Sequence, residues 1–372
     1  MLTSSLGRSV PSRDNLLALV SWYAENEATE PLCQNPDSPI PSSLLDACSY
    51  YVEVFGNKPC CFSDLRNFIE KLAGADKLAF LARIGKISSQ THAAEAAQVC
   101  LHKRGNLEDD STTDIWKPNP RLDRWITLES NRLMFRFLCA APSTETKVLQ
   151  TTLYEILLDC YSLLDIAQST EMGNLSAISI PIVTTLVKLH WVQAHGDATP
   201  FFGQGYLIQA ACLLEKLQTL VPEDRQICLL KLRVYSLLGV PTLALDEYHK
   251  LQVRDILNDT ISHEIYTRIS GHQPFYLGMS GSESNGKDPF HSLCEALDFY
   301  DQWDQDLTDF LFKIRDVQVH GMFLDVVEMM EKRRGSFTWR LLLLEKRRMA
   351  RMRDQEKDLG NLGDIGGVNH HL

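Results

Sequence analysis

The sequence predicts an all-α fold, an α-α solenoid of paired helices that ends in long C-terminal helices. Apolar residues recur at intervals of three and four along most of the chain, which is the period of a helix with one buried face. The run richest in β-branched residues, SAISIPIVTTLV, is interrupted by Pro181, which a central strand would exclude. Serine and glycine stand where several apolar runs begin and end, as helix-capping residues do.

Length and composition place the chain among folded globular proteins. Its 372 residues are 44% hydrophobic, enough to bury a full core in one large or two ordinary domains without disulfides or metals. The formal net charge of −11 argues against a protein that coats its whole surface with nucleic acid, but it permits a local basic patch.

Cysteine usage and the N-terminus favour a reducing, cytoplasmic location. The ten cysteines show no C-x-x-C spacing, and most lie among apolar neighbours as small core residues would. No apolar core of a signal peptide precedes Arg13, and we expect no later stretch of membrane-spanning length. The first 13 residues, rich in Ser and Arg, resemble either a weak mitochondrial presequence or a frayed terminus.

The first half of the chain reads as a variable, partly helical segment over 1–40 followed by a helical array over 41–180. One helix is expected to open at Ser42 or Ser43 and to stop at Gly56, and the next, FSDLRNFIEKLAG, to end at Gly74. The first of these helices buries Leu44, Cys48, Tyr51, Val52 and Phe55, the second Leu65, Phe68, Ile69 and Leu72, and a third Leu149, Leu153, Ile156, Leu157, Cys160 and Leu164. Further helices are predicted at about 14–27, 77–103, 121–141 and 181–194, with Pro181 in a first turn.

Residues 181–270 carry a spacing that needs an explanation. A large residue is followed by Gly, Ala, an aromatic residue and a small or apolar residue, at the offsets of the 34-residue tetratricopeptide repeat. The residues at these positions are Tyr235, Gly239, Ala244, Tyr248 and Leu251. Glycine lets the chain turn and alanine permits close helix approach, so the spacing predicts packing, with a ligand-binding motif as the alternative.

A weaker copy of the same ladder lies one repeat earlier. Its positions are Phe201, Gly205, Ala210, Leu214, Leu217 and Pro222. The segment QAHGDATPFFG reads as a loop where the first helix of that repeat should lie.

Signals for catalysis, metals or cofactors are poor. QAHGDA, at 193–198, fits the pyrophosphate loop of acetyl-CoA enzymes, but it follows an amphipathic run where that loop requires a strand. SHEIYTR lacks the second His of a zinc motif, and LEDDSTTD lacks the Gly and Glu of a calcium loop. The Cys60–Cys61 pair is read as packing at a helix entrance, with redox chemistry as the alternative. We therefore expect no enzyme, cofactor or metal site.

The C-terminal part reads as a polar linker over 271–289, helices over 290–353 and a disordered tail over 354–372. Residues 331–357 hold ten basic and four acidic residues, a net charge of 10 − 4 = +6 that leaves −17 for the rest of the chain. Arg340, Arg347, Arg348 and Arg351 share one helix face, while Trp339, Leu342, Leu343, Met349 and Ala350 share another. This basic face is either solvated or a contact for ribosomal RNA phosphates.

Two blocks resemble one known family. GNKPCCFSDLRNFIEKL (56–72) is similar to its Lys, Cys, Cys-Phe, Asp-Leu pattern at a helix start. LKLRVYSLLGVPTLALDEYHKLQVRDILNDTISH (230–263) is similar to its Leu-Gly, Tyr-x-x-Leu, basic, Ile and Asp-Thr pattern, with Leu257 where the family often has Gln. The family is the non-catalytic, auxiliary subunit of the N-terminal acetyltransferase B (NatB) complex, and the resemblance covers roughly 45–353.

The resemblance implies a tetratricopeptide-like superhelix that forms a heterodimer with a separate catalytic acetyltransferase and helps to station it at the ribosome. That complex acetylates nascent chains beginning Met-Asp, Met-Glu, Met-Asn or Met-Gln. No cofactor, membrane or small-molecule substrate of the chain's own is implied. Family members are longer, so we expect this chain to be their central and C-terminal part. The alternatives are a helical scaffold for another cytosolic partner and an inactive truncated paralogue.

Overall fold

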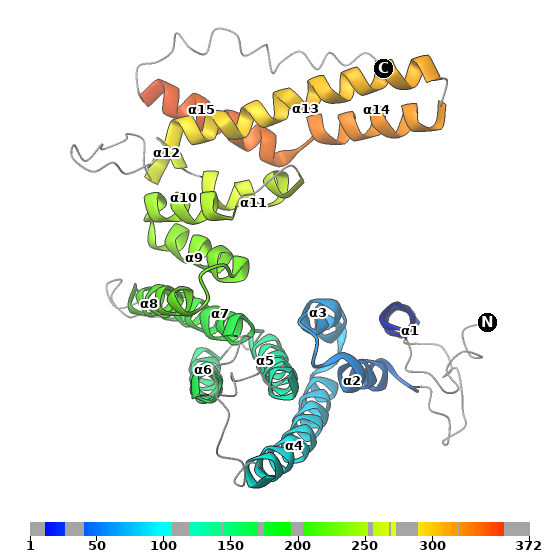
Figure 1. Ribbon diagram of the computed structural model, residues 1–372, viewed down its shortest axis with the longest axis vertical. Helices are drawn as coiled ribbons and strands as arrows, with labels where there is room; N and C mark the ends of the chain where they lie inside the picture. Colours follow the sequence, from blue (N-terminus) through cyan, green and yellow to red (C-terminus); the bar gives the residue numbers. More distant parts are fainter. Residues whose placement is uncertain are drawn as a thin grey trace. The chain divides into compact units, whose positions relative to one another are not determined.

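The computed structural model describes residues 12–26, 41–105, 120–142, 145–169, 175–194, 204–251, 256–267, 269–272, 289–317 and 320–352 (Figure 1). All regular elements in these ranges are helices, which confirms the predicted all-α fold. The chain divides into two compact units, Met1–Pro222 and Glu223–Leu372. The segment limits read from the sequence are stretches of similar pattern rather than compact units, and they stay predictions.

Unit 1 begins with α1 (Arg13–Glu25), α2 (Leu44–Phe55), α3 (Cys61–Lys71) and α4 (Gly74–Gly105). The predicted start of α2 is confirmed, because the Ser43 hydroxyl accepts a hydrogen bond from the backbone N–H of Asp46 at 3.1 Å. The predicted stop is confirmed as well, since Gly56 is the C-terminal cap of α2.

Gly56 is required for space rather than for an unusual backbone angle. A Cβ atom there would lie 2.4 Å from the carbonyl oxygen of Val52 and 2.6 Å from Cδ1 of Leu128. Leu128 belongs to α5 (Pro120–Ala140), and buried Asn131 of the same helix donates hydrogen bonds to the carbonyls of Gly56 and Lys58, at 2.8 and 2.9 Å. The turn between α2 and α3 is therefore held directly against α5.

The predicted end of the helix over FSDLRNFIEKLAG at Gly74 is wrong. Helix α3 ends at Lys71, the backbone of Leu72 is extended, and Gly74 is the first residue of α4. No atom lies within 4 Å of a Cβ built on Gly74, so this glycine meets no steric demand and served as a misleading stop signal. Leu65, Ile69 and Leu72 are buried as predicted, whereas Phe68 is only partly buried.

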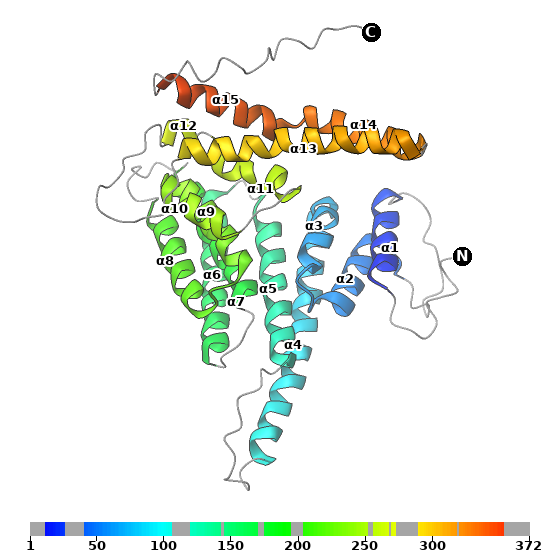
Figure 2. The same ribbon diagram turned by 45° about the horizontal axis from the view of Figure 1, so that its top comes forward.

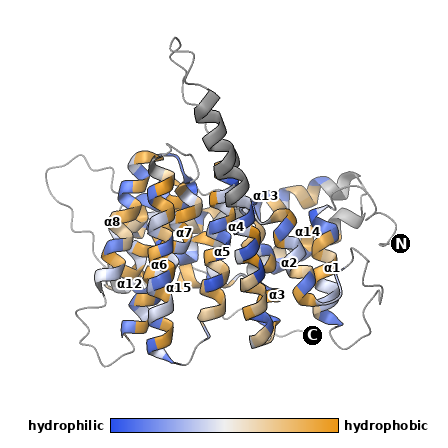
Figure 3. Ribbon diagram, turned by 90° about the horizontal axis from the view of Figure 1, so that it is seen from below, coloured by the Kyte–Doolittle hydropathy of each residue, from blue (hydrophilic) through white to orange (hydrophobic). Residues whose placement is uncertain are grey.

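The second half of unit 1 is built from α5, α6 (Thr146–Ser169), α7 (Leu175–Ala194) and α8 (Gln204–Leu220). Each packs against the next along the chain, and α5 also packs against α7. All six apolar residues predicted to line one face of α6 are buried. Figure 3 shows hydrophobic and hydrophilic residues sharing the same helices, as stacked amphipathic helices require.

Helix α7 departs from two sequence expectations. It begins at Leu175, so Pro181 lies inside the helix and not in its first turn. Proline has no backbone N–H and cannot donate to the carbonyl four residues earlier, at Ala177. The helix is also long and apolar enough to cross a membrane by length and composition alone, contrary to our expectation, although half of its apolar window is buried inside the protein.

Unit 2 contains α9 (Arg225–Leu238), α10 (Pro241–Lys250), α11 (Ile256–Tyr266), α12 (Ile269–His272), α13 (Pro289–Val317), α14 (His320–Arg334) and α15 (Phe337–Met352). The long C-terminal helices are thus confirmed. Helix α13 packs against both α14 and α15 (Figure 2), and α11 and α12 pack against α15. The predicted linker lies outside the described residues except at its two ends, and so does the tail after residue 352.

Candidate interaction surfaces

The helix pair α9–α10 adopts the geometry that its spacing predicts. Gly239 ends α9 in the left-handed conformation, with φ 72° and ψ 31°, which a residue with a side chain rarely adopts. The N–H groups of Gly239 and Val240 then donate to the carbonyls of Ser236 and Tyr235, at 3.2 and 3.0 Å. Pro241 follows as the first residue of α10, where its fixed φ suits a helix start.

The other members of the ladder are packing residues. Tyr235, Ala244, Tyr248 and Leu251 are all buried, and Ala244 is fully so. The Tyr248 ring packs edge to face against the Tyr266 ring of α11, with centroids 5.7 Å apart. This contact joins the helix pair α9–α10 to the next helix. Packing of this kind accounts for the spacing without a ligand-binding motif.

The weaker ladder, one repeat earlier, does not form a second helical hairpin of this kind. Gly205 lies within α8 and makes no turn there, and Phe201 lies outside the described residues. Ala210, Leu214 and Leu217 are nevertheless all buried on one face of α8. The apolar positions of the repeat are present, but the glycine position does not end a helix.

A buried ion pair joins α9 to α10, and the sequence analysis missed it. Nζ of Lys231 lies 2.8 Å from Oε1 of Glu247, and their side chains are only 2% and 4% exposed. Lys250 reaches the same oxygen at 2.8 Å from a half-exposed position, and the Lys231 ammonium lies 5.6 Å from the centroid of the Tyr235 ring. The burial of Lys231 could have been predicted from its position in the helix, because it is four residues from both Ile227 and Tyr235 on the buried face.

The protonation state of Glu247 follows from these contacts. Burial alone would raise its pKa, but the hydrogen bonds and charges of Lys231 and Lys250 outweigh it and hold the pKa of Glu247 below its ordinary value. The carboxylate is therefore charged at neutral pH, and the pair stabilises the hairpin only while both partners remain.

Helix α15 presents the predicted basic face. Arg340 and Arg351 are exposed and Arg347 is partly exposed, while Leu342, Leu343, Met349 and Ala350 are buried on the other side. Trp339 is only partly buried. The fourth arginine, Arg348, has a partner within the chain, because one of its guanidinium nitrogens lies 2.6 Å from Oε1 of Glu345.

Glu345 is a second buried carboxylate that the sequence analysis missed. It is 1% exposed, and its Oε2 accepts hydrogen bonds from the backbone N–H and the hydroxyl of Ser270, at 3.0 and 2.6 Å. Ser270 belongs to α12, so this carboxylate fastens α15 to α12. The burial of Glu345 could also have been predicted from helix spacing, since it follows Thr338 and Leu342 on the same buried face.

Helix α13 carries the opposite charge to α15. It holds seven acidic and two basic residues, a net −5, whereas α15 holds five basic and one acidic residue, a net +4. Burial and neighbouring Asp298 raise the pKa of Asp301, against the opposing charge of Lys346 on α15. Part of the basic charge of α15 is therefore balanced inside unit 2, and the arginines on its outer face remain accessible.

The block 56–72 has a polar centre at Asp64. Arg13 of α1 donates to both carboxylate oxygens, at 2.9 and 2.5 Å, and the hydroxyl of Tyr51 donates at 2.6 Å. The Arg13 hydrogen bonds are the largest cause that holds the pKa of Asp64 below its ordinary value. This carboxylate therefore ties α1, α2 and α3 together, which explains an acidic residue just inside a helix start.

Cys61 and Cys60 are packing residues at the same turn. Cys61 is fully buried and Cys60 is partly buried, and burial raises the pKa of both thiols. A thiol is most reactive as the thiolate, so this environment does not favour redox chemistry.

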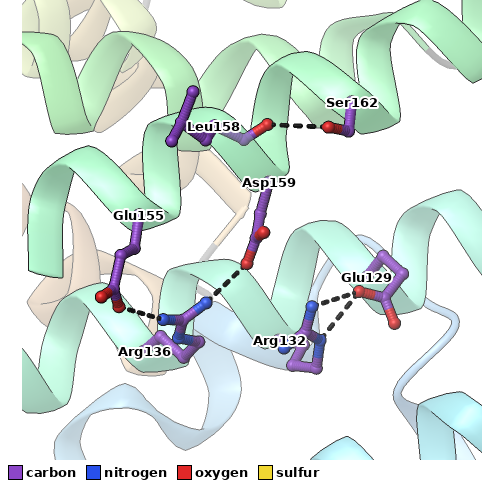
Figure 4. A network of polar contacts seen from close by, with 7 residues as sticks. All are labelled: Glu129, Arg132, Arg136, Glu155, Leu158, Asp159 and Ser162. Atoms are coloured by element: carbon purple, nitrogen blue, oxygen red, sulfur yellow. Dashed lines mark hydrogen bonds and ion pairs between the residues drawn. The ribbon is translucent and has the colours of Figure 1, made fainter.

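A further network joins α5 to α6 on the surface of unit 1. Figure 4 shows Arg136 of α5 reaching two carboxylates of α6, Glu155 at 3.3 Å and Asp159 at 2.6 Å. Leu158, on the same helix, is largely exposed. Helix α6 therefore presents apolar and acidic side chains side by side on its outer surface.

The alternative enzyme signals gain no support. The segment before QAHGDA is helix α7 where the phosphate loop would need a strand, and His195–Ala198 lie outside the described residues. Among the described residues, no three His, Cys, Asp or Glu side chains cluster in a way that could hold a metal ion. His263 of SHEIYTR has the adjacent Glu264 as an acidic neighbour, 3.8 Å away.

Stacked helix pairs, with a turn built on glycine and a ladder of buried side chains, define a protein of the helical-repeat class. The family model described as the N-acetyltransferase B complex (NatB) non catalytic subunit matches residues 2–365, and the chain belongs to this family. This confirms the resemblance found in the two sequence blocks. The family is that of a non-catalytic subunit, in agreement with the expectation that the chain is not the enzyme.

Curated relatives carry the same description at low identity. The chain is 26% identical over 246 residues to mouse "N-alpha-acetyltransferase 25, NatB auxiliary subunit", a match to 65% of this chain and 22% of the relative. The human protein of that name is 25% identical over 253 residues, again 65% and 22%. The Arabidopsis thaliana "N-terminal acetyltransferase B complex auxiliary subunit NAA25" is 27% identical over 227 residues, 61% and 18%. The match thus spans about a fifth of the length of these relatives.

Proposed function

We propose that this chain acts in the cytoplasm as a scaffold of the NatB complex, forming a heterodimer with the catalytic N-terminal acetyltransferase and helping to place it at the ribosome. The complex would acetylate nascent chains that begin Met-Asp, Met-Glu, Met-Asn or Met-Gln. The observation that carries the proposal is the family match over residues 2–365.

Exposed apolar side chains on both units support a role in protein binding. On unit 1, Tyr154 and Leu158 of α6 are 40% and 68% exposed, beside the Arg136 network. On unit 2, Leu237, Val240 and Leu243 are exposed within seven residues around the α9–α10 turn. Apolar groups with polar neighbours are typical of the centre and rim of an interface.

Co-purification with the catalytic acetyltransferase subunit of the same organism tests the proposal. We expect the tagged full chain to retain the catalytic subunit, and the pair, but not the chain alone, to acetylate a peptide beginning Met-Asp. A full-length family member serves as the positive control. If that member binds the catalytic subunit and this chain does not, the chain is a scaffold for another partner or an inactive shortened relative.

The proposed contact with the ribosome is through the basic face of α15. Arg340, Arg347 and Arg351 have side chains that reach solvent, whereas Arg348 also holds the buried Glu345. Replacing Arg340, Arg347 and Arg351 by Gln therefore tests the contact without disturbing the ion pair between Arg348 and Glu345.

Ribosome sedimentation across a salt series provides the measurement. The quantity compared is the slope of the logarithm of affinity against the logarithm of salt concentration. If three arginines each neutralise a phosphate, this slope should be shallower by about 2 to 3 in the three-Gln variant than in the parent. A matched control replaces exposed Lys71, Lys86 and Lys216 by Gln, which removes the same charge from other helices. Equal slopes for both variants and the parent would show that the α15 arginines are only a solvated face.

A further inference from the structure

The short connection between α14 and α15 combines a basic sequence with a reactive hydroxyl. It consists of Gly335 and Ser336, with Arg333 and Arg334 before it at the end of α14 and Phe337 after it as the first residue of α15. We propose that Ser336 is a phosphorylation site for a serine/threonine kinase that recognises basic substrates and uses ATP.

The sequence around Ser336 has the charge pattern that such kinases select. Kinases of this class use acidic side chains to bind arginines two and three residues before the acceptor serine. An apolar pocket that takes the residue after the acceptor adds to their specificity. Two Arg-Arg pairs occur in the sequence, 333–334 and 347–348, and only the first has a hydroxyl residue two positions later. The residue after Ser336 is Phe337, whose side chain is 76% exposed and free to enter such a pocket.

The hydrogen bonds described at this connection are those of two helix ends. The Ser336 hydroxyl accepts from the N–H of Trp339 at 3.3 Å, and the Ser336 carbonyl accepts from the N–H of Arg340 at 3.4 Å. Gly335 is exposed, and its N–H donates to the carbonyl of Glu331 at 3.0 Å. Helix ends open more readily than helix interiors. Opening the first turn of α15 breaks these end contacts and exposes buried Thr338, and the segment then presents the extended backbone that a kinase cleft binds.

The reaction is an ordinary phosphoryl transfer. The Ser336 hydroxyl oxygen forms a bond to the γ-phosphorus of ATP, and the bond from that phosphorus to the bridging oxygen of ADP breaks. The hydroxyl proton passes to the catalytic carboxylate of the kinase. The products are phosphoserine and ADP.

The phosphate would lie at the start of α15, on the side that carries the basic face. Arg340 is one turn further along the helix, and Arg347 follows at nearly the same angle. A phosphoserine carries a charge of about −1.5 to −2 and is stabilised at a helix N-terminus and beside arginine. It would engage Arg340 and reduce the positive charge offered to an anionic partner. This last effect rests on the proposed contact of α15 with ribosomal phosphates.

The site is tested on the full chain with ATP and the catalytic subunit of cAMP-dependent protein kinase as the probe enzyme, followed by intact and tandem mass spectrometry. We expect one phosphate on Ser336, none there in Ser336→Asn, and at least a tenfold lower rate in the Arg333→Gln, Arg334→Gln double variant. Asparagine is an effective N-terminal cap, so Ser336→Asn keeps the helix start while removing the acceptor.

Two controls make the result decisive. Ser162→Ala removes an exposed serine with no upstream arginine pair and should be phosphorylated like the parent. A synthetic peptide of residues 329–341 shows whether the isolated segment is a substrate. Phosphorylation of the peptide but not of the folded chain would overturn the site, and so would undiminished labelling of Ser336→Asn.

The charge effect has its own measurement. Ribosome sedimentation of the phosphorylated chain should show weaker binding and a salt slope shallower by about 1 than that of the unmodified chain. Unchanged binding would overturn the charge effect. A parent chain that does not bind ribosomes would defeat the proposed function and the charge effect together, while mass spectrometry still decides the site.

Discussion

Asp64 in unit 1 and Glu247 in unit 2 are both carboxylates that join helices through a basic partner, yet their surroundings differ. The Asp64 side chain is 9% exposed and that of its partner Arg13 is 47% exposed, whereas Lys231 and Glu247 are 2% and 4% exposed. Water and salt screen the first pair and reach the second hardly at all. The same kind of contact therefore joins α1 to α3 through a partly exposed arginine in one unit, and lies within the core in the other.

The largest expected effect comes from breaking the buried pair on one side. Lys231→Met removes the buried one of the two lysines that contact Glu247, and should destabilise the α9–α10 hairpin by about 3 to 5 kcal/mol. Amide hydrogen exchange of α9 and α10 is the measurement, because it reports on this hairpin separately from unit 1. The double variant Lys231→Met, Glu247→Leu should recover most of the loss. A double variant as unstable as the single one would show that the charges themselves are not what matters.

The glycines in the two regions should respond in different ways. Gly56→Ala places a methyl group against a backbone carbonyl and Leu128, which should cost about 1 to 3 kcal/mol. Gly239→Ala places a residue with a Cβ atom in the left-handed conformation, which should cost about 1 to 2 kcal/mol. Asparagine tolerates that conformation, so Gly239→Asn should recover part of the loss, whereas Gly56→Asn should be worse than Gly56→Ala. Thermal unfolding of the four variants checks both statements.

Acid should weaken the contact between Arg13 and Asp64. The pKa of Asp64 is lowered in the folded chain, so its contribution to stability is present above the ordinary carboxyl pKa and is lost as the pH falls through the lowered value. Hydrogen exchange in α1, corrected for the intrinsic rate, should therefore rise between about pH 6 and about pH 3. Asp64→Asn should show faster exchange in α1 at both pH values and a smaller change between them. An identical pH response in the variant would assign the effect to another group.

The smallest effect is expected at a fully surface pair. Arg66 and Glu70 of α3 lie 3.3 Å apart, with side chains 59% and 49% exposed. Arg66→Gln should change the free energy of unfolding by less than about 0.5 kcal/mol, in denaturant titrations at low and high salt. If Arg66→Gln lost as much stability as Lys231→Met, burial could not explain why the ion pairs of the two units differ in their contribution.

Periodicity was enough to predict the fold class and most buried positions, because a helix that packs on one side must repeat its apolar residues every three or four positions. The predicted helix limits were wrong at Gly74 and Pro181, because glycine and proline usually mark a helix limit but here lie within helices. Gly74 opens a helix without steric need, and Pro181 lies in the interior of α7.

The polar centres were harder to predict than the apolar core. Lys231, Glu247 and Glu345 stand in buried register, but a charge in that register has no visible partner until the helices are placed. Arg348 illustrates the same limit, because the sequence puts it on the basic face while its contact with Glu345 depends on where that carboxylate is buried. Spacing along one helix predicts which side a residue faces, and only the tertiary fold supplies the partner.

The cysteines have a practical consequence for studying the protein in solution. Burial raises the pKa of Cys48 and Cys160 to about 12, and Cys61 and Cys228 are buried as well, whereas Cys212 on α8 is exposed. A maleimide dye at neutral pH should therefore choose Cys212 among the described thiols, once Cys33 and Cys100 are replaced by Ser. The chain thus carries its own attachment point for a fluorophore, from which distances to the proposed partners can be measured.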